Sequence, residues 1–277
     1  CFHLERYGID NSININSPGG SWNIDSGNYY GLKEYVDFSN PGNCDVAIMA
    51  VHGGNMEVGT EQMATYIYNE LSSRGQDVAL WVYGSRNVDC SNCEAGCEME
   101  CHHVTSGAMD PECDPYLREI LSECKVGVAL HGCAGGCPAT GDTGGLPPIL
   151  VGGRAEYEFK DMIVTELGNR LGGNYFYINF DDVSDCKYFV DDVSCYRGAN
   201  HCNIVNQFPT YGGGLPGIQL EMPPEMRVSA DVLLDDSQCL ADPAGCFDRF
   251  ETDNIWGDTL LASDAYVDAI ENYIAFK

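Results

Sequence analysis

Short, almost continuously apolar runs recur along this chain, separated by polar segments rich in glycine. Runs of this length are typical of strands that are buried on both faces of a sheet. Strands are predicted at residues 45–51, 77–83, 125–130, 149–151, 175–179 and 217–222. Pro223 and Pro224 end the last run, because proline cannot donate a hydrogen bond to a neighbouring strand.

Amphipathic helices are predicted between these strands. Apolar residues recur every four positions in residues 58–74, and Gly75 follows as a helix stop. Further helices are predicted at residues 114–123, 155–171 and 259–276. A strand, a helix and a second strand in succession imply a right-handed crossover between parallel strands. The pattern therefore predicts an α/β fold.

The domain organisation follows from the shift in composition near residue 40. Residues 1–40 are dominated by asparagine, serine and glycine, which predicts an extended N-terminal arm. Within it, NYYGLKEYVDF is a candidate start of the domain proper. Residues 41–277 are predicted to form a single α/β domain with a cysteine-rich insertion at residues 88–113. The arm is expected to pack on its own domain, and the alternative is that it reaches a neighbouring subunit.

The net charge of −28, from 14 basic and 42 acidic residues, disfavours several partner classes. Nucleic acids and anionic membranes are disfavoured because neutralising phosphates requires clustered Lys and Arg. No apolar run approaches the roughly 20 residues that span a bilayer. One acidic cluster is a candidate Ca²⁺ site or, alternatively, a solvated acidic face. It comprises Asp181, Asp182, Asp185, Asp191 and Asp192.

Fifteen cysteines in 277 residues favour an oxidising compartment, so an extracellular, secreted protein is expected. The odd count leaves at least one thiol free or paired with another chain. Cys1 at the first position also fits a lipid-anchored lipoprotein, as the weaker alternative. The insertion between Cys90 and Cys113 is either a zinc cluster or a loop closed by disulfides, and the cysteine content favours the loop. Further loop-closing pairs are expected at Cys133–Cys137, Cys195–Cys202 and Cys239–Cys246.

Three predicted strands end in residues that can bind a metal or transfer a proton. His52 and Glu57 follow the first strand, and His131 follows the third. Carboxyl ends of strands in an open α/β sheet are where ligands bind, so these side chains are expected to meet. Three protein ligands and one open position are what a catalytic zinc ion requires. Gly53 and Gly54 are expected to let the chain turn.

The alternative is that the two histidines are ordinary loop residues with satisfied hydrogen bonds. The convergence of three strand ends favours the metal site over this alternative. Glu221, in the last predicted strand, is the candidate general base. Alternatively, its carboxylate is held in a structural ion pair with Arg227 or Arg154.

The segment HGGNMEVGTEQMA resembles the HGG-x-x-E-x-GT signature of the zinc-dependent poly-γ-glutamate hydrolases of bacteriophages and their bacterial relatives. LHGCAG, VGGR, the Asn203–Asn206 segment and GIQLEMPPEMR resemble the later motifs of that family in the same order, over residues 44–230. The resemblance implies a carboxypeptidase A-like fold with a mixed, mostly parallel central sheet flanked by helices. It also implies one Zn²⁺ bound by His52, Glu57 and His131, with Glu221 as the catalytic carboxylate.

The sequence departs from that family in ways that bear on the substrate. Gln207 stands where the family tends to carry arginine, and the cysteine-rich insertion is foreign to the phage enzymes. An acidic protein needs local positive charge to bind a polyanion, and Arg154 and Arg197 are candidate carboxylate clamps. Structural ion pairs are the alternative for both. The full set of candidate substrate-binding residues is Arg154, Arg197, Asn203, Asn206 and Arg227.

Two hypotheses for the function follow. The first is a secreted zinc-dependent amidohydrolase or peptidase that cleaves γ-glutamyl or similar amide bonds by metal-activated water. The alternative is an extracellular structural, filament-forming or adhesive protein on a hydrolase-like scaffold that retains the metal site. The N-terminal arm and the odd cysteine would then join copies into a homo-oligomer or fibre.

Overall fold

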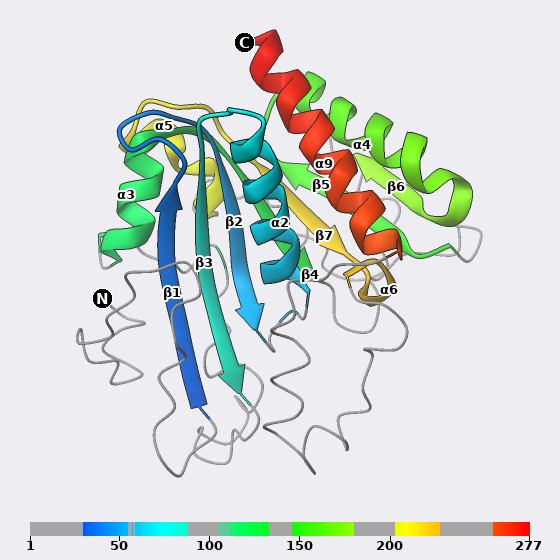
Figure 1. Cartoon of the computed structure of the whole chain (residues 1–277), viewed down its shortest axis with the longest axis horizontal. Helices are drawn as coiled ribbons and strands as arrows, with labels where there is room; N and C mark the ends of the chain where they lie inside the picture. Colours follow the sequence, from blue (N-terminus) through cyan, green and yellow to red (C-terminus); the bar gives the residue numbers. More distant parts are fainter. Residues whose placement is uncertain are drawn as a thin grey trace.

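A mixed sheet forms the centre of the molecule (Figure 1). The computed structural model describes residues 30–54, 57, 59–87, 106, 109, 111–112, 114–132, 146–179, 203–227 and 257–277. Within these residues seven strands pair in the order β1-β3-β2-β4-β7-β5-β6. They are β1 (Tyr30–Phe38), β2 (Cys44–Gly54), β3 (Val78–Asn87), β4 (Cys124–Gly132), β5 (Pro148–Gly153), β6 (Phe176–Asn179) and β7 (Ile218–Met222). The β1–β3 and β5–β7 pairs are antiparallel and the other pairs are parallel, which confirms the predicted sheet.

Helices cover both faces of this sheet (Figure 1). The described helices are α2 (Thr60–Ser73), α3 (Pro115–Glu123), α4 (Tyr157–Leu171), α5 (Phe208–Tyr211), α6 (Pro224–Arg227) and α9 (Gly257–Phe276), with 3₁₀ turns η2 (Gly172–Asn174) and η5 (Ile204–Asn206). Helices α2, α4 and α9 pack on one face, and α3, α5 and η5 pack on the other. Of the described helices, none combines the length and the apolar character needed to cross a bilayer.

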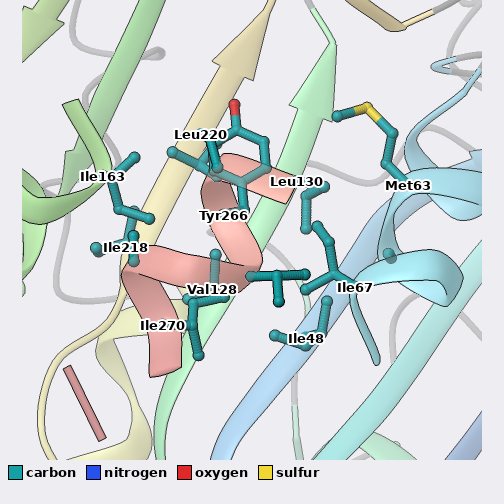
Figure 2. Packing of buried hydrophobic residues seen from close by; sticks show 14 of the residues in the cluster. Ile48, Met63, Ile67, Val128, Leu130, Ile163, Ile218, Leu220, Tyr266 and Ile270 are labelled. Carbon is teal, nitrogen blue, oxygen red and sulfur yellow. The ribbon is translucent and has the colours of Figure 1, made fainter. Parts of the chain in front are cut away.

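The two faces of the sheet bury two separate hydrophobic clusters. In β2, Ile48 packs toward α2 and α9, whereas its neighbour Met49 packs toward α3 and α5. Successive side chains in a strand point to opposite faces, so a strand buried on both faces must be apolar throughout. Figure 2 shows Tyr266 of α9 near Leu220 and Ile270 of α9 near Val128, and all four residues belong to the first cluster.

Helix α2 ends where the sequence predicts. Gly75 has a φ of 81°, a left-handed conformation that glycine adopts without a steric penalty. The amides of Gly75 and Gln76 donate to the carbonyls of Ser72 and Leu71, which satisfies the end of the helix. The chain then enters β3, which lies parallel to β2, so the predicted parallel crossover is confirmed.

The structure differs from the expected extended arm at its C-terminal part. Residues 30–38 form β1, which pairs along its length with β3 at the edge of the sheet. The domain therefore includes NYYGLKEYVDF from Tyr30 onward. The sequence of β1 has no continuous apolar run, because Lys33, Glu34 and Asp37 interrupt it, although Tyr35 joins the core. Residues 1–29 lie outside the described residues.

A disulfide joins Cys44 and Cys124, the first residues of β2 and β4. The two residues are opposite each other in the parallel register, with their Cα atoms 4.4 Å apart. The sequence does not predict this pair, because 80 residues separate the two cysteines. The expected pairs in residues 133–137, 195–202 and 239–246, and the acidic cluster at residues 181–192, lie outside the described residues.

Loss of this disulfide is expected to destabilise the fold. The Cys44→Ala/Cys124→Ala double variant should have a free energy of unfolding about 4 kcal/mol lower than that of the wild type. Without the bond, a loop of this length gains conformational entropy in the unfolded state. Urea unfolding of the variant and the wild type measures the difference. An unchanged unfolding midpoint would contradict a stabilising role for the bond.

A buried carboxyl lies between β1 and α3. Glu34 accepts a hydrogen bond of 3.1 Å from the Trp81 indole and lies beside Asp114, which caps the N-terminus of α3. Burial, and then the charge and hydrogen bonding of Asp114, raise the pKa of Glu34 well above its ordinary value. Glu34 therefore holds its proton in the folded chain at pH values where it has lost the proton in the unfolded chain.

The sign of the pH dependence follows from that raised pKa. Stability from Glu34 is complete below about pH 4.3, where the carboxyl titrates in the unfolded chain, and falls as pH rises toward the folded pKa. Glu34→Gln should remove this loss, so its stability relative to the wild type should rise by up to about 1.4 kcal/mol per pH unit in that window. Urea unfolding between pH 4 and pH 8 measures the effect, with the exposed Glu119→Gln in α3 as the control. Parallel pH profiles for wild type and Glu34→Gln would refute the protonated state.

Candidate metal centre

Three side chains from separate segments converge at the carboxyl ends of β2 and β4. They are His52 near the end of β2, Glu57 between β2 and α2, and His131 near the end of β4. One ligand atom from each residue lies within 4.8 Å of the other two, and all three side chains are buried. The structure therefore brings these three residues together, as the sequence predicts.

The distances between the ligand atoms fit a small cation. His52 Nδ1 lies 2.7 Å from Glu57 Oε1 and 3.1 Å from His131 Nδ1, and His131 Nδ1 lies 3.5 Å from Glu57 Oε2. Ligands about 2.1 Å from a tetrahedral zinc ion lie roughly 3.4 Å from one another. Two imidazole nitrogens and a carboxylate are also a donor set that zinc prefers. His52, Glu57 and His131 could therefore hold a metal ion through three of its ligand positions.

The local backbone explains how His52 and Glu57 meet. One extra residue in β2 shifts its register with β3 between the Ala50 and Gly53 pairs, so the regular alternation breaks at His52. The amide of Glu57 then donates to the carbonyl of His52 over 3.0 Å and closes the turn. Gly53 and Gly54, expected to form this turn, are instead the last residues of β2.

Gly59 is the glycine that the turn requires. Its φ is 92°, and a Cβ at this position would lie 2.2 Å from the carbonyl oxygen of Arg227. Any side chain would therefore be strained and would clash with the α6 backbone. The close approach of the two backbones fixes the start of α2, and the preceding Glu57, against the segment that follows β7.

Further hydrogen bonds hold the ligands in place. His131 Nε2 lies 3.0 Å from Ser106 Oγ, and the amide of Gly132 donates to Glu57 Oε2 over 2.8 Å. Such outer partners orient a ligand and fix which of its atoms faces the metal. Ser106 lies in the cysteine-rich insertion, so this insertion contributes directly to the centre.

Glu221 lies beside the three ligands. It is opposite His131 in the parallel register of β4 and β7, on the same face of the sheet. Burial raises the pKa of Glu221 to about 8, and the charge of Glu57 acts in the same direction. His131, a hydrogen bond from Gln219 and the charge of Arg227 oppose this rise.

The pKa of His131 depends on the same carboxylates. Burial lowers the pKa of His131, but the charge and hydrogen bond of Glu57 and the charge of Glu221 raise it, and the net shift is upward. The carboxylates therefore favour positive charge at this point, which a bound cation would supply in place of the proton.

The predicted substrate-binding residues lie in different surroundings. Arg227 is buried, its Nε donates to the carbonyl of Met222 over 3.2 Å, and its guanidinium group lies where a side chain on Gly132 would be. Arg154 is exposed just after β5, and its backbone amide donates to Asn206 Oδ1 over 3.0 Å. Arg197 lies outside the described residues.

Asn203 is buried and faces β7. Its side-chain amide donates to Gln219 Oε1, and Gln219 Nε2 in turn donates to Glu221 Oε1 over 2.7 Å. Neither Gln219 nor Ser106 is among the site residues predicted from the sequence. Gln219 could have been identified from the sequence, because it is a polar residue in an apolar strand. It lies two positions before Glu221 and therefore on the same face of the strand.

The model of the poly-γ-glutamate hydrolase family matches residues 31–250. The chain belongs to the poly-γ-glutamate hydrolase family. The suspected resemblance is therefore confirmed, and membership of the family makes the chain a hydrolase. A comparison with curated proteins finds no match.

Solved structures agree on the fold. A bacteriophage poly-γ-glutamate hydrolase is 18% identical with a TM-score of 0.58, over 92% of this chain and 94% of that chain. A structure of YNDL, described as apo and zinc-free, is 18% identical with a TM-score of 0.53, over 91% of this chain and 92% of that chain. Both similarities establish that this hydrolase shares their overall architecture.

Removing one ligand is expected to abolish tight metal binding. Glu57→Gln keeps the size of the side chain but removes its charge, so zinc affinity should fall more than about 100-fold, since loss of a mere outer partner costs up to that much. Chelator competition and metal analysis of the purified hydrolase measure the loss, with Glu119→Gln as the matched control on α3. Unchanged zinc affinity in Glu57→Gln would exclude this residue as a ligand.

Proposed function

We propose that the chain is a zinc-dependent hydrolase that cleaves γ-glutamyl or similar amide bonds by attack of water. The observation that carries the proposal is the convergence of His52, Glu57 and His131 beside the buried Glu221. Family membership supports the reaction class, and the family name supports a γ-glutamyl substrate. The fold shared with a protein whose structure is described as zinc-free and apo supports zinc as the metal.

His52, Glu57 and His131 would hold the ion. When bound, zinc supplies a Lewis acid that polarises a carbonyl group and lowers the pKa of a water molecule. With three ligands from the protein, a bound ion would keep one position open for water or substrate. Burial of the ligands keeps bulk water from competing with the substrate.

Glu221 is the general base in this proposal. It takes a proton from the attacking water as the oxygen bonds to the scissile carbonyl carbon. It then gives this proton to the leaving nitrogen as the carbon–nitrogen bond breaks, which produces a carboxylic acid and an amine. A carboxylate that burial makes more basic than usual suits a group that must both accept and return a proton.

Recognition of a polyanionic substrate requires positive charge near the site, because the chain has a net charge of −28. Among the described residues, Arg227 is a buried cation that lies next to Gly132 and acts on Glu221. Arg154, exposed after β5, is the proposed outer clamp for a substrate carboxylate. Secretion is proposed as well, and the Cys44–Cys124 disulfide supports an oxidising compartment.

Glu221→Gln tests the reaction. The variant keeps the shape of the side chain but cannot accept a proton, so kcat for poly-γ-glutamate hydrolysis should fall by about 10² to 10⁴-fold. Metal analysis should still find one zinc ion per chain. Release of new amino groups from poly-γ-glutamate measures the rate, and α-linked polyglutamate tests the linkage.

The controls separate the parts of the proposal. Glu119→Gln should keep full activity, and a chelator should abolish it in the wild type. Activity that persists in Glu221→Gln would remove Glu221 as the base. Zinc-loaded wild type that cleaves only the α-linked polymer would overturn the γ-glutamyl substrate.

A further inference from the structure

A directional chain of hydrogen bonds runs behind Glu221. The backbone amide of Val205 donates to Asn203 Oδ1 over 3.2 Å, and Asn203 Nδ2 donates to Gln219 Oε1. Gln219 Nε2 then donates to Glu221 Oε1 over 2.7 Å. All three side chains are buried, with exposed fractions of 6% for Asn203, 2% for Gln219 and 5% for Glu221. The chain thus links a backbone group to the proposed base without solvent in between.

One end of this chain fixes its direction. A backbone N–H only donates, so the oxygen of the Asn203 side chain must face Val205 and its nitrogen must face Gln219. The Gln219 oxygen accepts that bond, which leaves the Gln219 nitrogen to face Glu221. The carboxylate therefore meets a donor, and the reverse orientation would set two oxygens against each other.

The fold holds both ends of the chain rigidly. Asn203 caps η5, which packs against β4 and β7. Gln219 and Glu221 are two residues apart in β7, so both point to the face that carries His131, while Ile218, Leu220 and Met222 point into the opposite core. A buried glutamine in an apolar strand is costly unless it is fully bonded, and here both ends of its amide are bonded.

We propose that Gln219, oriented by Asn203, is a positioning residue that holds the Glu221 carboxylate toward the centre formed by His52, Glu57 and His131. The inference rests on the proposed function, in which Glu221 moves the proton. Gln219 engages Oε1 and so restricts rotation of the carboxylate about its last bond. A base that is misplaced by about 1 Å costs on the order of 100-fold in rate, so this restriction matters for kcat.

Two variants test the chain from its two ends. Gln219→Met keeps the length of the side chain but removes the donor. Asn203→Asp leaves β7 untouched and replaces the donor to Gln219 by an oxygen, so the Gln219 amide must turn and present its oxygen to Glu221. Both variants should lower kcat on poly-γ-glutamate by about 10 to 100-fold, with KM and the zinc dissociation constant within about threefold of wild type.

The matched control is Gln76→Met, the same exchange at a glutamine that bonds Glu271 on the α9 side of the molecule, which should leave kcat unchanged. Thermal unfolding of the zinc-free variants checks that they fold. If Gln219→Met does not fold, Asn203→Asp carries the kinetic test. A rise in KM with unchanged kcat, or unchanged kcat in a folded variant, overturns the positioning role.

A structural readout separates this inference from the proposed function. Crystal structures of zinc-loaded wild type and Asn203→Asp should show the Glu221 carboxylate rotated in the variant. An unmoved carboxylate overturns the inference even if the variant is slow. Wild type that binds zinc but leaves poly-γ-glutamate intact overturns the proposed substrate, and the rotation of Glu221 between the two structures still decides the positioning role.

Discussion

The parallel pairing of β2, β4 and β7 is the constraint on which the centre depends. These strands are neighbours in the middle of the sheet, and because they are parallel their carboxyl ends lie side by side. The register places His131 opposite Glu221, so a proposed ligand and the proposed base are adjacent before any loop contributes. The two clusters on the faces of the sheet specify this register, because a slip of one residue would move buried side chains to the wrong face.

Charge sets a second requirement. Two buried carboxylates, Glu57 and Glu221, lie close together, which is costly unless positive charge accompanies them. Burial and the charge of Glu57 raise the pKa of Glu221, and the two carboxylates raise the pKa of His131, so both groups hold protons more tightly than usual. A cation between the ligands would meet the requirement for positive charge better, since it carries two charges and leaves the histidines neutral. The two buried carboxylates therefore account both for the raised pKa values and for the suitability of the site for a cation.

Most of the sheet, and the convergence at its edge, follow from the sequence, because apolar runs specify parallel strands and their ends must meet. The remainder depends on tertiary contacts that spacing does not encode. β1 is an edge strand in which Lys33, Glu34 and Asp37 interrupt the apolar residues, so it has no continuous run to find. The Cys44–Cys124 pair requires the β2–β4 register. Ser106 contacts His131 from 25 residues away in the sequence, a separation that no local pattern encodes. Gln219 is close to Glu221 in the sequence, but its orientation depends on Asn203, which spacing does not encode.

The same disulfide gives the molecule a closed covalent ring. Residues 44–124 carry β2, α2, β3 and α3, and with them His52 and Glu57, whereas His131 lies seven residues beyond the ring. A protease that cuts one peptide bond inside the ring produces no separate fragment, because the bond keeps both pieces attached. The two parts of the candidate metal centre would then stay on one molecule, which gives the hydrolase a tolerance to nicking that a chain without the bond lacks.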